Sequence, residues 1–412
     1  MFPVIVLVLV FLLIAVRQVG RLRLEIWQVM CAGAAAVLLA GDIRPAAALE
    51  AVDWDVMVFL FGMFAAGQTL ELSGWLAHVK FEVFKRARTE EGLLLTLVLF
   101  MGLASAFLMN DTLAIVGTPV ALLLARKHSI SPKALLLALA FSITIGSVMS
   151  PIGNPQNLLV AVKGEVAAPF LTFLKYLALP TLLNLGAVFL LVRCFYPEEF
   201  KKRELKHSQE PVRDAALARL AKVTSVVLAA AIAAKIILVS VNPAWDFRLT
   251  WIALAAAAPG LLLSPRRLEL ARRVDWSTLA FFAGMFVLMR AVWDTGFFQE
   301  LISGSGADIS GLGPIMAVSV GLSQFISNVP LVALYLPMLQ HAGAGTPELM
   351  ALAAASTFAG NLFILGAASN VIIIQNAEKK AGETITFLEF ARVGVPLTFI
   401  NAIIYWVFLR FT

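Results

Sequence analysis

The chain has 412 residues, of which 60% are hydrophobic and 14% are charged, and its formal net charge is +6. Soluble globular domains carry roughly 45–50% apolar and about 25% charged residues, so this composition excludes an ordinary soluble domain. Apolar runs near or above the ~18–20 residues that cross a bilayer recur along the chain, and they predict an all-α polytopic membrane protein.

Neither nucleic acid nor a metal cofactor is expected as a partner. The isoelectric point of about 9.4 is explained by basic loops on one side of a membrane. Two cysteines, Cys31 and Cys194, cannot supply a disulfide framework or a Cys-x-x-Cys site. The four histidines are scattered and lie in or near predicted loops: His78, His128, His207 and His341.

The apolar runs, taken in chain order, predict about ten transmembrane helices plus two helical hairpins. Residues 1–16 are apolar with no basic region before them, so they are expected to form the first span and not a cleaved signal. Four runs are interrupted by Gly, Pro, Asn or Ser, which predicts hairpins or broken helices. The expected segments are 3–16, 24–41, 54–73, 92–126 (interrupted), 133–163 (interrupted), 168–193, 220–241, 249–264, 276–294, 310–340 (interrupted), 349–377 (interrupted) and 387–411.

Lysine and arginine predict the orientation, because cytoplasmic loops retain positive charge. Most of the 32 basic residues fall in six clusters, at 17–23, 80–88, 126–133, 193–222, 266–273 and 379–380. All six lie on one side only if 92–126 and 310–340 each return to the side where they began, as a helical hairpin does, whether it is re-entrant or fully crossing. In a cell (inner) membrane, the N-terminus is then expected outside and the polar linker 194–219 in the cytoplasm.

The two halves of the chain contain a repeated motif. Val-Asp-Trp, Gly-Met-Phe and a final Gly coincide between Val52–Gly74 and Val274–Gly296 at an offset of 222. By the charge pattern the two copies run in opposite directions, so we expect two inverted-topology repeats at 1–193 and 220–412, joined by the linker 194–219. Inverted repeats are typical of secondary transporters, whose sites lie near the middle of the membrane.

Polar residues in the first hairpin have counterparts in the second. Asn110, Asp111 and Thr112 interrupt the apolar run in LMNDTLAIVGTP, and Ser327 and Asn328 occupy the corresponding place in QFISNVPLVALYLP. Each asparagine is followed nine residues later by a proline. We expect these residues to form two facing tips of a central site.

Two further interruptions correspond across the halves as G-x-x-x-N, namely Gly153–Asn157 and Gly366–Asn370. Irregular backbone inside a membrane must be buried in protein or line a wet cavity. Its freed oxygens can coordinate a cation, and helix N-termini can face an anion. The candidate substrate- or ion-binding residues are Asn110, Asp111, Thr112, Gly153, Asn154, Asn157, Ser327, Asn328, Gly366, Ser369 and Asn370. The candidate Na⁺ ligands among them are Asn110, Asn154, Asn328 and Asn370.

Charged residues near these segments are candidates for coupling or gating. A carboxylate in mid-membrane costs ~2.5–3.5 kcal/mol on insertion scales, so Asp111 is by default functional. It can coordinate Na⁺ or carry a proton; the alternative is that it only caps the following helix. Val329 replaces it in the second half, so charge chemistry is expected to be asymmetric. Arg290 and Asp294 are further candidates, although their i, i+4 spacing also allows them simply to pair.

These motifs resemble the ion transporter superfamily, which holds arsenite permeases, NhaD-type sodium/proton antiporters, citrate transporters and divalent anion/sodium symporters. MNDTLAIVGTP resembles the Asn-Asp segment of arsenite permease-like proteins, and GNPQN resembles the G-x-P-x-N loop of the symporters. GNLFILGAASNVII, VDWSTLAFFAGMF and EFARVGVPLT also fit that group. The resemblance covers nearly the whole chain. It implies re-entrant hairpins, broken helices, elevator-like movement against a scaffold, and a homodimer.

Two departures from that superfamily bear on the substrate. The symporters carry Ser-Asn-Thr at both tips, whereas this chain has Met-Asn-Asp-Thr and Ser-Asn-Val-Pro, so the dicarboxylate motif is incomplete. No cysteine falls in these motifs, so thiol capture of arsenite is not supported.

The expected function is secondary active transport of a small anion or oxyanion (arsenite-like, inorganic or carboxylate) by alternating access, coupled to H⁺ or Na⁺. One alternative is a Na⁺/H⁺ antiporter in which Asp111 exchanges the two cations. A second, of a different class, is an ion channel lined by the broken helices. An enzyme is not expected, because the sequence contains neither H-E-x-x-H nor G-x-S-x-G.

Overall fold

The computed structural model describes residues 1–16, 18–19, 22–23, 25–73, 84, 87–200, 215–242, 245, 247–297, 300 and 310–412. Several residues used to predict the orientation lie outside this part of the chain. They are Arg17, Arg21, Lys80, Lys85, Arg86 and the stretch 201–214 of the predicted linker.

Where it is described, the first half of the chain consists of helices joined by loops and turns, together with one short strand pair. Its helices are α1 (Phe2–Val16), α2 (Ile26–Leu39), α3 (Pro45–Ala51), α4 (Trp54–Ser73), α6 (Glu90–Ser105), α7 (Asn110–His128), α8 (Pro132–Ser147), α9 (Pro155–Lys163), α10 (Pro169–Phe173) and α11 (Leu179–Phe195). A π-helical turn, η1 (Leu174–Ala178), joins α10 to α11, and a 3-10 turn, η2 (Pro197–Glu199), follows. The two-residue strands β1 (Gln18–Val19) and β2 (Leu22–Arg23) pair antiparallel, a detail that the all-α prediction did not include.

The second half is also helical where it is described. Its helices are α12 (Ala215–Val241), α13 (Leu249–Leu263), α14 (Arg267–Arg273), α15 (Trp276–Trp293), α17 (Leu312–Ile326), α18 (Asn328–His341), α19 (Thr346–Phe358), α20 (Ala368–Ala381) and α21 (Phe387–Phe411). Two 3-10 turns, η4 (Ala359–Asn361) and η5 (Ile364–Gly366), lie between α19 and α20. All four predicted interruptions are therefore present, and each lies within its predicted segment.

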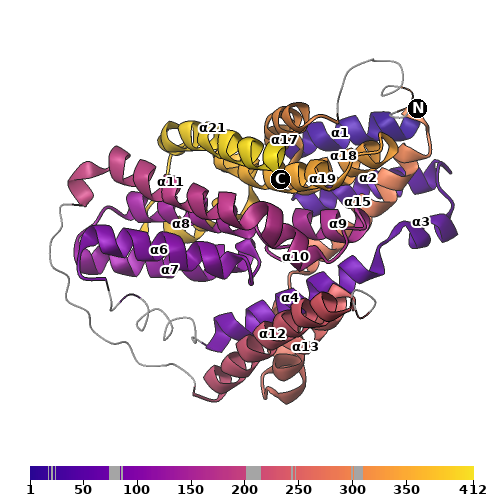
Figure 1. Cartoon of the computed structure of the whole chain (residues 1–412). Helices are drawn as coiled ribbons and strands as arrows, with labels where there is room; N and C mark the ends of the chain where they lie inside the picture. The colour runs from indigo at the N-terminus through magenta and orange to yellow at the C-terminus, as the bar shows by residue number, and fades with distance from the viewer. Residues whose placement is uncertain are drawn as a thin grey trace.

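The order of elements recurs between the halves. The series from α2 to α11 corresponds to the series from α13 to α21, and contacts recur with the halves exchanged: α4 packs on α13 as α15 packs on α2, and α7 packs on α20 as α18 packs on α9. In Figure 1, α4, α12 and α13 form a group below the remaining helices. This order agrees with the predicted duplication; the boundaries at 193 and 220 and the inverted topology stay predictions.

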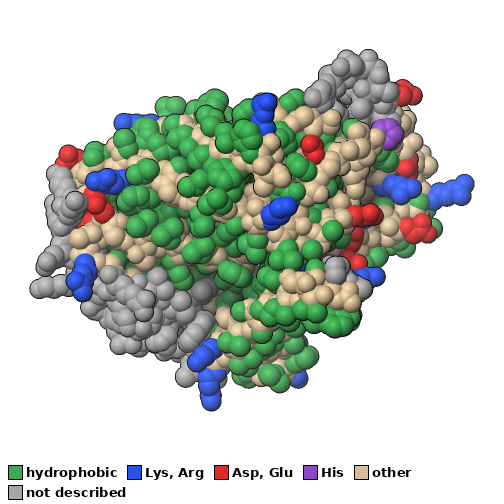
Figure 2. Space-filling view, in the orientation of Figure 1, with side chains coloured by type: hydrophobic (Ala, Val, Ile, Leu, Met, Phe, Trp, Pro, Cys, Tyr) green, Lys and Arg blue, Asp and Glu red, His purple; other side chains and the backbone are tan. Residues whose placement is uncertain are grey.

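Apolar surface covers the sides of the molecule. Within the described residues, five helices are long and apolar enough to cross a membrane by length and composition: α4, the continuous α10–α11 helix, α12, α15 and α21. Figure 2 shows hydrophobic side chains over much of the visible face, with most charged side chains toward its two ends. Leu183 and Leu190 of α11 and Phe399 and Ile403 of α21 are among the large apolar side chains that are exposed on the molecule. The all-helical membrane architecture is as predicted, while the number of about ten spans stays a prediction.

Close helix packing brings the first hairpin against the first broken helix. A Cβ atom on Gly146 of α8 would lie 1.9 Å from the carbonyl oxygen of Gly102 on α6, so the two backbones touch where these glycines cross. Small residues at crossings allow such approach between membrane helices. The crossing places the end of α6, and the tip that follows it, directly beside the end of α8.

Candidate functional site

The tip of the first hairpin is the turn at 106–109 together with the first residues of α7, and we call it tip 1. The backbone N–H of Asn110 donates to the carbonyl oxygen of Gly153, 3.1 Å away, which joins tip 1 to the first broken helix. The side chain of Asn110 is 6% exposed, and its Oδ1 has no hydrogen-bond partner in the described part of the chain. Thr112 faces α4, where its Oγ1 would lie 2.9 Å from a Cβ on Gly67.

Asp111 lies in the first turn of α7, and the alternative in which it caps this helix is wrong. The N-cap residue is Met109, which makes no side-chain capping bond. Among the described residues, none donates a hydrogen bond to the half-buried Asp111 carboxylate, and Asp275 repels it electrostatically. Helix capping would have explained the Asp111 carboxylate without any role in transport. Because Asp111 is not the cap, the presence of a carboxylate near tip 1 needs a different explanation.

The first broken helix turns through residues 148–154, which we call loop 1, and two asparagines hold its shape. Asn154 is the N-cap of α9: its Oδ1 accepts from the N–H of Asn157 at 2.8 Å, and its Nδ2 donates to the hydroxyls of Ser147 (2.9 Å) and Thr357 (3.2 Å). Asn157 is fully buried, and its Nδ2 lies 3.0–3.1 Å from three carbonyl oxygens, those of Ser147, Val148 and Ser150. The side-chain atoms of both asparagines are thus engaged with loop 1 and Thr357.

The different partners of these two asparagines predict different responses to the same substitution. Asn157→Asp is expected to lower the free energy of unfolding by roughly 2–5 kcal/mol, since a carboxylate cannot donate to carbonyls and leaving a buried group unpaired costs about 1–3 kcal/mol. Asn154→Asp is the matched control. Its two hydroxyl partners, Ser147 and Thr357, can donate to the carboxylate by giving up the bonds that they now donate to backbone carbonyls or to Asn157 Oδ1. Asp also caps helices as well as Asn, so the loss in Asn154→Asp is expected to be smaller. Thermal unfolding in detergent measures both; equal losses would contradict this assignment.

The tip of the second hairpin, tip 2, is a sharper turn. Ser327 alone separates α17 from α18, and it adopts φ of +69°, a region that side-chain-bearing residues rarely occupy. Asn328 begins α18, is 6% exposed, and accepts a hydrogen bond from Ser323 Oγ at 2.8 Å through its Oδ1. Strained backbone of this kind clusters at ligand sites, which agrees with the prediction that tip 2 forms part of one.

The second broken helix turns through residues 359–367, which we call loop 2, and amides from two other helices bind it. Gln324 of α17 donates from Nε2 to Ala359 O at 2.9 Å, and Asn370 of α20 donates from Nδ2 to Gly360 O at 2.7 Å. A Cβ on Gly366 would lie 2.8 Å from Gln324 Oε1 and 3.0 Å from Ala359 O. The α17 helix of the second hairpin and loop 2 are therefore in contact, as tip 1 and loop 1 are.

One hydrogen bond between the two halves has no counterpart among the described residues. Thr357 of the second half donates to Asn157 Oδ1 of the first at 3.1 Å. The offset of 213 that relates Gly153 to Gly366 makes Thr144 and Asn370 the counterparts of this pair. Thr144 lies beside Gly360, whose carbonyl Asn370 binds, yet Thr144 Oγ1 and Asn370 Oδ1 have no hydrogen bond within the described residues. The crossed hydrogen bond is made in one half only.

Side-chain oxygens that are buried without a described partner gather at the tips and loops. Such atoms are rare in folded proteins and each calls for an explanation, such as a bound ion or water. Those at the tips, the loops and the facing helices are Asn110 Oδ1, Thr144 Oγ1, Gln324 Oε1, Asn361 Oδ1, Ser369 Oγ and Asn370 Oδ1. Four helices, α7, α9, α18 and α20, also begin here, so their N-terminal dipoles add positive potential.

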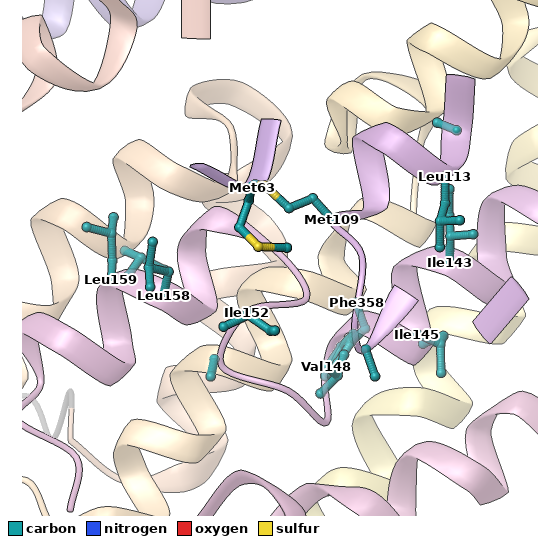
Figure 3. Close-up of a cluster of buried hydrophobic side chains, with 14 of the residues drawn as sticks. Met63, Met109, Leu113, Ile143, Ile145, Val148, Ile152, Leu158, Leu159 and Phe358 are labelled. Carbon is teal, nitrogen blue, oxygen red and sulfur yellow. The ribbon is translucent and has the colours of Figure 1, made fainter. Parts of the chain in front are cut away.

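Apolar side chains surround the polar groups of tip 1 and loop 1. Figure 3 shows Met63 of α4 beside Met109 of tip 1, with Ile152 of loop 1 close by and Leu113 of α7 and Phe358 of α19 farther along the same cluster. Each of these side chains is almost fully buried. In such low-dielectric surroundings polar contacts are strengthened, and unpaired polar atoms are correspondingly costly.

Arg290 and Asp294 lie elsewhere. Arg290 Nε is 2.9 Å from Asp294 Oδ2 at the end of α15, and both side chains are about half exposed. Arg290 lines a separate hollow of about 300 Å³ together with Lys163 of α9, whose ammonium is 2.9 Å from Asp53 Oδ2. The pairing expected from their spacing is present, and a gating role stays a prediction.

Five polar residues at or next to the loops were not predicted from the sequence: Ser147, Gln324, Thr357, Asn361 and Asn401. Asn401 had a usable signal, because Thr-x-x-Asn occurs at 181–184 and again at 398–401. Asn361 lies in the quoted GNLFILGAASNVII segment, while Ser147, Gln324 and Thr357 stand in apolar stretches without a distinctive motif.

The described helices, discontinuous segments and apolar flanks define an integral membrane transporter. The chain belongs to the CitMHS family, whose model, described as "Citrate transporter", matches residues 9–355.

Several relatives are named as transporters. An uncharacterized transporter of Mycobacterium tuberculosis is 30% identical over 371 residues, covering 85% of this chain and 84% of the relative. A silicon efflux transporter of Oryza sativa is 26% identical, covering 86% of each chain. Among solved structures, the YdaH transporter of Alcanivorax borkumensis superposes with a TM-score of 0.61 over 99% of this chain and 96% of that one, at 17% identity, which shows a shared fold.

Proposed function

We propose that this CitMHS-family transporter is a secondary active carrier of a small anion or oxyanion, coupled to H⁺ or Na⁺. One observation carries the proposal: unpartnered buried oxygens gather at two tips and two loops where four helices begin. Neutral oxygens can coordinate a cation without holding it irreversibly, and helix N-termini favour an anion. The same arrangement therefore suits a cation and an anion that are bound and released together.

Within this proposal the candidate residues have different roles. Asn110, Gln324, Ser369 and Asn370 offer free oxygens to the coupling ion or substrate, and Asp111 supplies the charge for coupling. Asn154 and Asn157 hold the conformation of loop 1 through hydrogen bonds to protein groups. The remaining candidates contribute to the shape of the tips and loops that form the site: Thr112, Gly153, Ser327, Asn328 and Gly366. The carrier is further proposed to be a homodimer in the cell membrane with its N-terminus outside and its linker in the cytoplasm.

Transport by reconstituted protein tests the proposal. Proteoliposomes with an internal pH dye receive arsenite, phosphate, sulfate, citrate, silicic acid or NaCl; silicic acid is included because of the rice relative's name. Uptake of one anion driven by an H⁺ or Na⁺ gradient is the expected result. Asn110→Ala and Asn328→Ala are each expected to reduce it at least about tenfold, the equivalent of ~1.4 kcal/mol. Gln375→Ala, an exposed position on α20, is the control. Normal transport by both asparagine variants would remove the proposed site.

The Na⁺/H⁺ antiporter remains the second candidate, because the Asp111 carboxylate has no hydrogen-bond donor or counter-charge among the described side chains. A carboxylate that exchanges Na⁺ for H⁺ must be free of such partners. Proton movement driven by NaCl alone, with no anion dependence, would favour the antiporter and contradict anion transport.

A further inference from the structure

Three asparagines form a buried chain outside the candidate site. Asn184 of α11, Asn361 of η4 and Asn401 of α21 are all 0% exposed. Asn401 donates from Nδ2 to Asn184 Oδ1 at 2.6 Å, and Asn361 donates from Nδ2 to Asn401 Oδ1 at 3.2 Å. Asn184 in turn donates to Pro180 O at 2.9 Å. Asn361 Oδ1 has no hydrogen-bond partner among the described residues. Burying three amides is costly even when most of their atoms are paired, so their placement here requires a reason.

The chain ends at loop 2, where three consecutive residues are each held by an amide from a different helix. Gln324 of α17 binds Ala359, Asn370 of α20 binds Gly360, and Asn401 of α21 binds Asn361. Gln324 belongs to the second hairpin and Asn370 to the second broken helix. Of these three amides, only Asn401 belongs to neither unit, because it lies on α21.

The backbone of α21 also approaches loop 2 closely. A Cβ on Gly394 would lie 2.2 Å from Asn361 O and 3.1 Å from Leu362 O, so loop 2 rests directly on this helix. Asn401 lies two turns further along α21 and binds the Asn361 side chain. Gly394 allows loop 2 to lie close to α21, while the directional hydrogen bond between Asn361 and Asn401 fixes the position of loop 2 along the helix.

Within the described residues, loop 1 has no hydrogen bond to α11 or α21; Asn154 and Asn157 hold it, together with Thr357 and the Asn110 N–H. The offset of 213 makes Val148 the counterpart of Asn361, and valine cannot form this bond. Loop 1 instead receives three donor contacts from Asn157. Asn370, the counterpart of Asn157, binds only one loop carbonyl within the described residues. Loop 2 therefore depends on Asn401 of α21 for hydrogen-bond support that loop 1 obtains mainly from Asn154 and Asn157.

We propose that Asn401 is a positioning residue for the transport site: through Asn361 it fixes loop 2, so that Ser369 and Asn370 face the bound ion or substrate. The functional half of this statement rests on the proposed function. Asn184 completes the hydrogen bonding of Asn401 and does not touch loop 2, so it serves as the matched comparison.

The test compares Asn401→Leu with Asn184→Leu in the full-length protein. Asn401→Leu removes the bonds of Asn401 to both Asn361 and Asn184, whereas Asn184→Leu removes the bonds of Asn184 to Asn401 and Pro180 O and leaves the Asn361–Asn401 bond in place. Both substitutions replace a buried amide with an apolar group of similar size. Hydrogen exchange of the backbone at 359–367 is expected to accelerate in Asn401→Leu only. For the panel anion that wild type transports, the half-saturating concentration is expected to rise about tenfold in Asn401→Leu, an effect typical of lost supporting contacts. It is expected to stay near wild type in Asn184→Leu.

The outcomes separate this proposal from the transport proposal. Unchanged exchange and unchanged half-saturation in Asn401→Leu, or equal changes in both variants, would overturn the positioning role. If wild type transports nothing in the panel, the transport proposal fails, and the exchange measurement still decides whether Asn401 holds loop 2. Should Asn401→Leu not fold, Asn361→Val breaks the same bond from the other end, copies the residue found in the first half, and carries the same expectations.

Discussion

Asp111→Asn is expected to abolish proton-coupled transport while leaving the protein folded. An amide has nearly the same shape as the carboxylate but can neither carry a negative charge nor take up a proton. Since no described residue hydrogen-bonds to this carboxylate, only its interaction with the α7 dipole and the repulsion from Asp275 are lost. The first of these is worth about 0.3–1 kcal/mol, so the melting temperature should change little.

The same variant distinguishes the two coupling ions. If Na⁺ is coupled, the amide oxygen can still coordinate it, and transport should persist with a half-saturating Na⁺ concentration raised roughly tenfold, which corresponds to ~1.4 kcal/mol of lost binding. Asp42→Asn, at an exposed turn after α2, is the control and should match wild type. Wild-type coupling in Asp111→Asn with either ion would show that this carboxylate has no part in transport.

Gly153→Ala is expected to eliminate transport and to destabilise the fold. The added Cβ would lie 2.4 Å from Ser147 O and 2.9 Å from Ser105 O, both backbone atoms at helix ends that cannot turn aside. Loop 1 must then shift, and the Gly153 O bond to the Asn110 N–H that joins it to tip 1 is lost. Overpacking of this kind costs about 1–3 kcal/mol, and a displacement of one ångström in a binding site is enough to reduce activity strongly.

Two other glycines provide graded comparisons. A Cβ on Gly366, the counterpart in loop 2, would first meet Gln324 Oε1 at 2.8 Å, the end of a flexible side chain, so Gly366→Ala should be milder. Gly186 of α11 has no atom within 4 Å of the added Cβ. Gly186→Ala should transport normally and gain up to about 1 kcal/mol from helix propensity. Uptake and thermal unfolding are measured for all three; a Gly153→Ala protein that transports like wild type would show that loop 1 has room to adjust.

Much of the architecture could be predicted because the relevant signals are local. The segment predicted at 54–73 is α4 as observed, and the run predicted at 92–126 with an interruption is α6 and α7, separated at residues 106–109. Hydrophobic length identifies a membrane helix, and Gly, Pro and Asn interrupt one, so both features can be read without knowing the neighbours. Membership of a transporter family was likewise recognisable from motifs.

The division of work among the asparagines could not be predicted. Asn110, Asn157 and Asn370 look alike in the sequence, yet both the Nδ2 and the Oδ1 of Asn157 have hydrogen-bond partners, while Asn110 and Asn370 each retain an unpartnered oxygen. The same holds for Asp111, whose capping role was open until the structure showed Met109 at the N-cap position. Which group pairs with which depends on distances of a few tenths of an ångström between helix ends.

The sequence by itself determined that this is a helical membrane protein, where its helices break, and which polar residues stand at the breaks. Hydrophobicity and helix-breaking residues act on the segment that contains them, so these features are readable one segment at a time. Only the tertiary structure decided that Thr357 binds Asn157, and that Asn401 connects Asn184 with Asn361. The physical reason is that hydrogen bonds are short and directional, and partners 200 or 217 residues apart meet only when all the intervening helices have packed.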